Sequence, residues 1–270
     1  MEEYKALRKS QGAANGSINR EIGVVSKVLS LAVKHRKLAR KPVFEKLDEK
    51  AAIRRGFVEQ PDFDLVMKHL APDLQLAALT AYTLARRMKS EVLRLRWADV
   101  DLVVGTVAIP TSKNGDPRRC RITLELKIRF AEHRERMIEV FGRLPEYVFV
   151  RAPGRYSHKT KVGLQRRNFD VAWRGACVRA AEMKGGDAGL AELLQHDLRR
   201  AGIRNLVRSG VTENVAMSFS GHRTRSVFDR YDIGSDADQV DAMARVAAFQ
   251  NRLQSRSCPS SVTSTDNPTR

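Results

Sequence analysis

The chain has 270 residues, and 49 Lys and Arg against 31 Asp and Glu give it a net charge of +18. An excess this large indicates a polyanionic partner, for which nucleic acid is the leading class and a membrane surface the weaker one. Because no apolar run reaches the length of a membrane span and the first residues are too charged for a signal peptide, we expect a cytoplasmic protein without a membrane partner.

The first 60 residues carry one clear helical pattern. Residues 1–16 are polar and contain two glycines, so we expect a loose arm or a fraying helix end there. From Ser17, a plausible N-cap, apolar residues recur with a helical period as far as Val33. This amphipathic helix cannot bury its own apolar stripe, and residues 1–42 barely supply a partner for it. The scattered charge and weak periodicity of residues 43–60 predict a linker.

Helical patterns resume after the linker. Pro61 and Pro72 each precede a run of apolar residues with helical spacing, and proline is well suited to the first position of a helix. A third helix is predicted over residues 92–97, which include two leucines, a valine and a tryptophan. These segments indicate an α-rich domain.

The pattern then changes to that of strands. Residues 103–124 alternate between apolar and polar side chains around the turn residues 114–117, which predicts an antiparallel β-hairpin. Residues 124–141 return to a helical pattern, and residues 147–150 read as a short buried strand. A further helix is predicted over residues 165–183. A small sheet therefore accompanies the helices.

The stretch from His196 to Tyr231 contains several residues of types that are common in catalytic sites. His196 and Arg199 are three positions apart in a helical pattern, so they share one face and can serve one site. Gly210 stands where a C-terminal helix cap is expected. His222 follows a second glycine, and Tyr231 comes shortly after it. A helix over about 236–252 follows.

This order of residues resembles the C-terminal signature of the tyrosine recombinases, the phage-integrase family: H-x-x-R, then Gly-His, then Tyr. The resemblance implies a mixed α/β, mostly α-helical catalytic domain with a small antiparallel hairpin sheet over residues 61–252. The phrase SINREIGVVSKVLSLAVKHRKL is similar to the last helix of the family's core-binding domain, so residues 1–42 are interpreted as a remnant of that domain in a shortened chain. Residues 253–270 are rich in Ser, Thr and Pro and are expected to be disordered.

The resemblance also implies the roles of four residues. Tyr231 is the expected nucleophile, which must be assisted because an ordinary phenol has a pKa of about 10. Arg199 is the expected phosphate clamp, since a guanidinium binds two phosphate oxygens and stays charged. His196 would act as general base or acid. His222 would donate a hydrogen bond to a phosphate oxygen.

The family's other arginine is sought in the phrase LARRMKSEVLRLRWADVD. The commonest family spacing places that arginine at Met88, where this chain departs from the pattern. The register R-x-x-S-E, found in some integrase-like sequences, selects Arg87, which we favour over Arg86. Glu91 is expected to orient the active-site helices through hydrogen bonds.

The family's lysine lies in a β-hairpin loop, where it protonates the leaving oxygen. Lys113 stands beside the Asn-Gly turn of the predicted hairpin, and we assign it this role.

The resemblance implies an enzyme of mobile elements that cuts and rejoins double-stranded DNA through a 3′-phosphotyrosyl intermediate. It implies no metal and no cofactor, and a homotetramer assembled on DNA. The chain has no glycine-rich phosphate loop, so nucleotide hydrolysis is unsupported. Three scattered cysteines without a C-x-x-C pair argue against disulfides and structural zinc.

Three alternatives remain open. A type IB topoisomerase shares the chemistry but relaxes supercoils. A DNA-binding regulator or recombination-defective remnant would bind without cutting, and Met88 with the shortened N-terminal part favours it. A basic structural protein of RNA assemblies is disfavoured because no aromatic stacking pattern is present.

Overall fold

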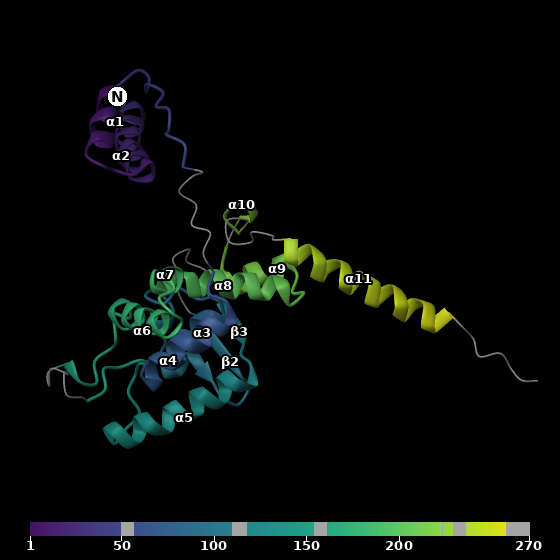
Figure 1. The fold of residues 1–270 in the computed structure, drawn as a ribbon. Helices are drawn as coiled ribbons and strands as arrows, with labels where there is room; N and C mark the ends of the chain where they lie inside the picture. Colours follow the sequence, from purple (N-terminus) through teal and green to yellow (C-terminus); the bar gives the residue numbers. More distant parts are fainter. Residues whose placement is uncertain (50–56, 110–117, 154–160, 223, 229–235, 258–270) are drawn as a thin grey trace, which may run out of the picture. The chain divides into compact units, whose positions relative to one another are not determined.

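The computed structural model describes residues 1–49, 57–109, 118–153, 161–222, 224–228 and 236–257. The chain divides into two compact units, Met1–Arg55 and Gly56–Arg270 (Figure 1). Among the described residues, no helix is both long and apolar enough to cross a membrane.

The N-terminal unit is a helical hairpin of α1 (Glu2–Ser10) and α2 (Asn15–Lys34). The Glu21 carboxylate on α2 accepts hydrogen bonds from Tyr4 Oη at 2.7 Å and from Arg8 Nε and Nη2 at 3.0 and 2.8 Å. The expectation of a loose arm was therefore wrong. The ends of α1 also suit the helix dipole, with acidic residues in the first turn and basic residues in the last. Ile18 and Ile22 at the start of α2 are buried in this unit, whereas Val25, further along the apolar stripe, remains 42% exposed.

Part of the segment expected as a linker is tied to α2. Asn19 donates through its side-chain amide to the carbonyl oxygen of Leu47 and accepts from the amide of Leu47, both at 2.8 Å. Asn15 donates to the carbonyl oxygen of Asp48 at 2.7 Å. These bonds satisfy polar backbone groups that no regular element pairs.

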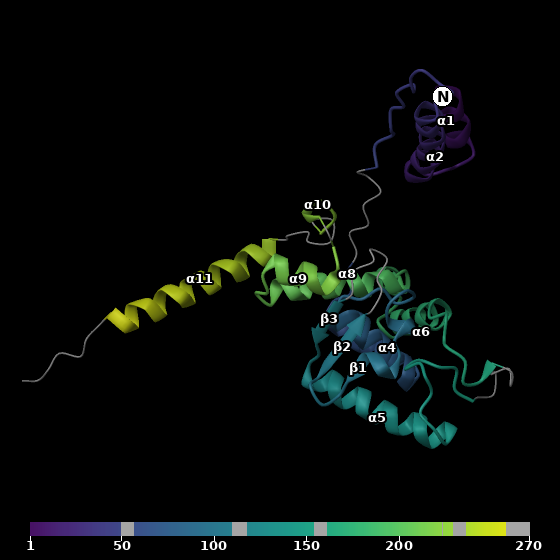
Figure 2. The same ribbon diagram turned by 180° about the vertical axis from the view of Figure 1, so that it is seen from behind.

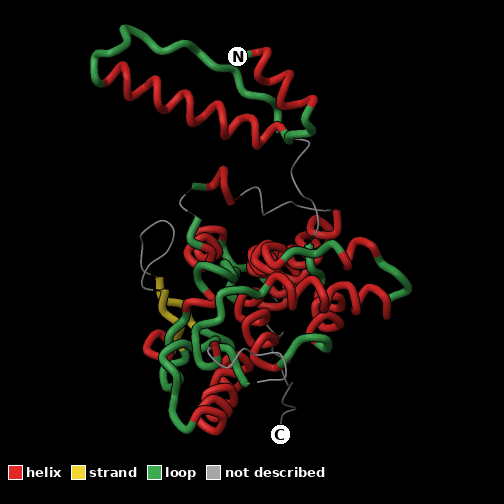
Figure 3. The backbone as a smooth tube through the Cα atoms, turned by 90° about the vertical axis from the view of Figure 1, so that its left-hand side faces the viewer, coloured by secondary structure: helices red, strands yellow, loops and turns green. Residues whose placement is uncertain are grey.

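The second unit is mostly helical, with its strands gathered in one small part of it (Figure 3). Its elements are, in chain order, α3 (Gln60–Met67), α4 (Pro72–Thr83), the short 3-10 helices η2 (Val92–Arg94) and η3 (Trp97–Asp99), β1 (Val100–Asp101), β2 (Thr106–Ile109), β3 (Arg118–Arg121), α5 (Leu124–Phe141), α6 (Asp170–Met183), α7 (Ala188–Ala191), α8 (Gln195–Arg208), α9 (Glu213–Ser220), α10 (Arg225–Phe228) and α11 (Asp236–Ser257). The predicted mixed α/β, mostly helical class is confirmed.

The strands form an antiparallel sheet in the order β1-β2-β3 (Figure 2). Val107 of β2 faces Cys120 of β3 across the sheet. This pairing confirms the predicted hairpin strands, whose turn at 110–117 lies outside the described residues. The helix predicted next is confirmed as α5, which begins at a Thr123 cap and ends at Gly142 in the left-handed conformation, with φ of 69°.

One helix prediction was wrong and another was too long at its start, because distant backbone pairs with these segments. The predicted α-helix over 92–97 is interrupted at Leu95, whose carbonyl accepts from Val148 N at 2.9 Å, while Trp97 N donates to Glu146 O at 3.1 Å. The helix predicted over 165–183 begins only at Asp170, because the preceding residues pair with the 149–150 segment.

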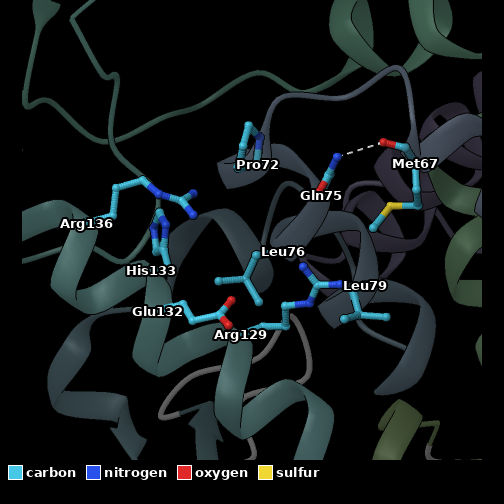
Figure 4. A pocket seen from close by; sticks show the side chains of 9 residues that line it. All are labelled: Met67, Pro72, Gln75, Leu76, Leu79, Arg129, Glu132, His133 and Arg136. Carbon is cyan, nitrogen blue, oxygen red and sulfur yellow. Dashed lines mark hydrogen bonds between the residues drawn. The ribbon is translucent and has the colours of Figure 1, made fainter.

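A cluster of buried apolar side chains fills the space between the helices and the sheet. A cavity of about 30 Å³ remains between α4 and α5, with His133 and Leu76 in its lining (Figure 4). Gln75 borders it and donates to the carbonyl oxygen of Met67 at 3.0 Å. A space of this size holds about one or two water molecules, so we assign it no ligand.

Candidate active site

A buried carboxylate lies at the centre of the site. The Glu91 side chain is 0% exposed, and its Oε1 accepts from Arg87 Nη1 at 2.9 Å and from Arg118 Nη2 at 2.7 Å. Its Oε2 accepts from the amide of Arg87 at 3.2 Å and lies 4.0 Å from Arg199 Nη1. Burial alone would raise the pKa of Glu91, but the charges of Arg118 and Arg199 outweigh it and hold that pKa below its ordinary value. Glu91 is thus an anion that orders three cations.

The turn that precedes Glu91 depends on a strained residue. After α4 ends, Ala85 adopts φ of 51°, a left-handed conformation that is rare for residues other than glycine. The Ala85 carbonyl consequently accepts from Arg199 Nη1 at 2.8 Å. Such strain persists only where the surrounding structure fixes it. Here it holds the Ala85 carbonyl against Arg199 of α8, two residues before Arg87.

Helix α8 approaches this turn closely because residue 202 is glycine. A Cβ atom at Gly202 would overlap the carbonyl oxygen of Tyr82 and lie 3.0 Å from the Cα of Ala85. The close contact brings Arg199, one turn earlier on α8, against the Ala85 carbonyl. Arg199 is 1% exposed, and its Nη2 also donates to the carbonyl oxygen of Ser220 at 2.7 Å.

His222 is held between Arg199 and Ser220. Its Nε2 lies 3.1 Å from Arg199 Nη2, and its Nδ1 lies 3.0 Å from Ser220 Oγ. Because a guanidinium can only donate, Nε2 is the acceptor, and the proton is assigned to Nδ1, which donates to Ser220 Oγ. Burial, and then the charges of Arg199 and Arg87, lower the pKa of His222 to about 4. The imidazole is therefore neutral near pH 7.

His196 occupies the first turn of α8, on the same side as Arg199. The residue is exposed to solvent, yet partial desolvation by the surrounding protein lowers its pKa, and the charge of Arg199 lowers it further. The charge of Arg87 depresses the pKa of both histidines. Arg87, His196, Arg199 and His222 therefore converge on one region, from the turn after α4, from α8 and from the turn after α9.

Comparison with known proteins places this arrangement in a family. The sequence profile of the phage integrase family matches residues 63–236. The chain belongs to the phage integrase family. No curated protein sequence matches it. Site-specific recombination of DNA is the function of this family.

Solved structures of recombinases share the fold of this family member. The Tn1549 transposon integrase (residues 82–397) in complex with circular intermediate DNA matches with a TM-score of 0.63 and 15% identity, over 90% of this chain and 82% of that one. The XerA recombinase matches with a TM-score of 0.52 and 16% identity, over 93% and 81%. A lambda integrase dimer bound to a COC′ core site matches with 0.54 and 14%, over 84% and 61%. The fold is that of the tyrosine recombinases.

The two adjacent arginines of this integrase-family chain have different surroundings. Arg86 is 1% exposed, and its Nη2 donates to Cys120 Sγ at 3.0 Å. The Arg87 side chain is 23% exposed and paired with Glu91. Arg87 shares Glu91 with Arg199, and its charge lowers the pKa of both His196 and His222, so these surroundings favour Arg87 as the clamp. Met88 is buried in the apolar core.

Two predicted site residues, Lys113 and Tyr231, lie outside the described residues. The strands on either side of the Lys113 loop end at Ile109 and begin at Arg118. Shortly before Tyr231, Phe228 is fully buried with its ring edge toward His222, at 6.0 Å between ring centroids.

Arg118 and Ser220 have positions in the site that sequence reasoning missed. Arg118 reaches Glu91 although the two are 27 positions apart, and no spacing rule relates them. Ser220 precedes Gly221 and looks like an ordinary polar helix residue. The available signal was the position of Arg118 at the start of the strand that follows the lysine loop.

A wide cleft of about 660 Å³ opens beside Glu91. Five basic residues line it: Lys89, Arg94, Arg96, Arg166 and Arg167. Arg96 pairs with Glu146 at 3.2 Å, and Arg166 pairs with Asp73 at 3.0 Å. Lys89, Arg94 and Arg167 are exposed to solvent. The cleft therefore offers a cationic surface next to the arginine and histidine cluster.

Proposed function

We propose that this chain is a tyrosine-type site-specific recombinase that cleaves double-stranded DNA with Tyr231 and forms a 3′-phosphotyrosyl intermediate. The convergence of Arg87, His196, Arg199 and His222 around one region carries this proposal. Two guanidinium groups and two imidazoles suit a phosphodiester undergoing substitution, because negative charge accumulates on its non-bridging oxygens.

Arg87 and Arg199 bind the non-bridging oxygens of the scissile phosphate in this proposal. Each well-placed donor of this kind stabilises the transition state by about 3 kcal/mol. In this structure, Arg199 Nη2 lies 3.1 Å from the Nε2 of His222. His222 can donate to the phosphate, as the family resemblance implies, only with a proton on Nε2, so substrate binding must change its tautomer or its protonation state.

His196 and Lys113 carry out the proton transfers in this proposal. Tyr231 loses its proton as its oxygen attacks phosphorus, and His196, neutral near pH 7 because its pKa is lowered, is the proposed acceptor. The bond from phosphorus to the 5′ oxygen breaks, and Lys113 supplies the proton for that oxygen. Attack by a 5′ hydroxyl of another strand reverses these steps and releases Tyr231. The phosphoryl bond is conserved throughout, so no nucleotide is consumed.

The cationic cleft is the proposed track for the DNA backbone beside the site. Arg94→Glu combined with Arg167→Glu is expected to weaken binding to duplex DNA at least about 10-fold and to flatten the dependence of affinity on salt, because fewer counterions are released. Fluorescence anisotropy across a salt series measures both effects. Arg134→Glu, an exposed arginine on α5 outside this cleft, is the matched control. Equal losses in both variants would contradict the proposed track.

The proposed recombinase acts as an assembly of several copies on DNA. Strand exchange between two duplexes requires protomers on each, and we place four copies on DNA in the cytoplasm, with no membrane partner. The lambda integrase dimer and the Tn1549 integrase among the similar structures are described as bound to DNA, which supports DNA as the assembling partner.

Covalent trapping tests the proposed function. A duplex with a nick near the cleavage position loses a short fragment after cleavage, so the enzyme stays attached. With a pool of candidate sites, we expect a protein–DNA band on a denaturing gel for the wild type and none for Tyr231→Phe. Tyr4→Phe removes an exposed tyrosine of α1 and is the control that keeps the band.

The outcomes also separate the alternatives. A band accompanied by relaxation of supercoils without strand exchange would favour a type IB topoisomerase. DNA binding without a band at any salt concentration would favour a regulator or a recombination-defective remnant, a reading that Met88 supports at the sequence level.

A further inference from the structure

We propose that Arg118 is a positioning residue that fixes the β-hairpin to the phosphate-binding cluster. This inference rests on the proposed function, because the hairpin matters for catalysis through the Lys113 loop. Arg118 is the first residue of β3, and its side chain is 11% exposed. It is thus placed at the junction between the lysine loop and the sheet.

The guanidinium of Arg118 joins three segments. Its Nη2 donates to Glu91 Oε1 at 2.7 Å, and its Nη1 donates to the carbonyl oxygen of Phe219 at 3.0 Å. Glu91 is the same carboxylate that pairs with Arg87, and Phe219 lies in the last turn of α9, just before the Gly221–His222 turn. One planar group therefore spans the hairpin, the arginine turn and the histidine turn.

Gly221 adds an independent observation for this role. The residue adopts φ of 71°, which favours glycine, and a Cβ atom at this position would overlap the Arg118 guanidinium. Arg118 consequently packs directly over the backbone that precedes His222. Any side chain at 221 would push the guanidinium away from Phe219 or displace His222.

Both terminal nitrogens of Arg118 are engaged by protein acceptors, the Glu91 carboxylate and the carbonyl oxygen of Phe219. Its carboxylate partner is completely buried, so moving the guanidinium away would leave a buried negative charge with less compensation. Lysine could keep one charge near Glu91, but its single ammonium lacks the planar fork that reaches two acceptors in fixed directions. We therefore expect the geometry, more than the charge, to be required.

Arg118→Lys and Arg118→Met separate geometry from charge, with Arg119→Met as the matched control, an exposed neighbour on the same strand. In single-turnover cleavage of the nicked duplex, we expect Arg118→Met to be at least about 30-fold slower and Arg118→Lys about 10-fold slower, as for a displaced catalytic group. DNA affinity should stay within about 3-fold of the wild type, since Arg118 makes no proposed phosphate contact. Arg119→Met should cleave at the wild-type rate.

The pKa of His222 provides a readout that does not require activity. Burial and the charges of Arg199 and Arg87 lower this pKa most, and the charge of Arg118 lowers it further. In an NMR titration, the pKa of His222 should rise in Arg118→Met, stay low in Arg118→Lys, and be unchanged in Arg119→Met. The acid limb of the pH profile of cleavage should therefore move to higher pH in Arg118→Met.

A double-mutant cycle covers the case in which Arg118→Met folds poorly. Gly221→Ala should slow cleavage in the wild-type background by displacing Arg118, and slow it much less in the Arg118→Lys background, because part of the interaction is already lost. If Gly221→Ala slowed cleavage by the same factor in both backgrounds, the inference would be overturned.

Two results would contradict the positioning role directly. One is a cleavage rate for Arg118→Met equal to that of Arg119→Met. The other is a His222 pKa that is the same in Arg118→Met as in the wild type. Absence of cleavage by the wild type would instead count against the proposed function. The His222 titration would then still decide whether Arg118 acts on the histidine turn.

Discussion

Glu91→Gln is expected to lower the free energy of unfolding by about 3–5 kcal/mol, because removing one partner of a buried ionic cluster leaves the others uncompensated. The carboxylate is 0% exposed and pairs with Arg87 and Arg118, while Arg199 lies 4.0 Å away. Urea unfolding at pH 7 measures the change. Glu59→Gln, which removes a carboxylate with a 52% exposed side chain that pairs with Arg204, is expected to cost less than about 1 kcal/mol.

The pH dependence of this difference has a defined sign. The pKa of Glu91 lies below its ordinary value in the folded protein, so its stabilising contribution is complete above the unfolded-state pKa. The contribution is lost as the pH falls through the folded-state pKa. The wild type and Glu91→Gln should therefore differ fully at pH 7 and converge in acid. Equal stabilities at pH 7 would show that Glu91 does not order the arginines.

Arg199→Lys is expected to slow DNA cleavage by at least about 100-fold, the range found for removing one well-placed donor to a developing anion. The substitution keeps the charge but loses the fork that contacts the carbonyl oxygens of Ala85 and Ser220 at 2.8 and 2.7 Å. Single-turnover cleavage measures the rate, and anisotropy measures DNA affinity, which should change little.

Arg204→Lys is the matched control for Arg199→Lys on the same helix. Arg204 pairs with Glu59 at 2.6 Å and stacks over Phe57, away from the histidines. We expect its cleavage rate within about 3-fold of the wild type, as for a residue outside the transition-state contacts. A similar loss in both variants would mean that α8 is simply disturbed, and the clamp assignment for Arg199 would fail.

The parts of the fold that local pattern determines could be predicted from sequence. Helix α5 has an apolar period, a threonine cap and a glycine end, all within its own residues. The strands of the hairpin alternate in their own sequence as well. The segment over 92–97 has an equally helical pattern, but its backbone pairs with residues 146–148, and this long-range pairing overrides the local preference.

The site residues also divide into those that local sequence predicts and those that depend on long-range packing. The order of His196, Arg199 and His222 is a short-range signature, so a family resemblance locates it. The Arg118–Glu91 pair depends on how the hairpin packs against the turn after α4, which no spacing encodes. Helix α1 was missed for the same reason, since the Glu21 contacts with Tyr4 and Arg8 cross a turn between two helices.

The central claim is that Tyr231 carries the covalent bond to DNA, and mapping the attached nucleotide tests it most directly. The trapped complex would be digested with nuclease and trypsin, and the modified peptide sequenced by mass spectrometry. We expect a nucleotide linked through its 3′ phosphate to Tyr231, in a peptide that ends at Arg245 and contains no other tyrosine. A nucleotide on any other residue, or one linked through a 5′ phosphate, would contradict it.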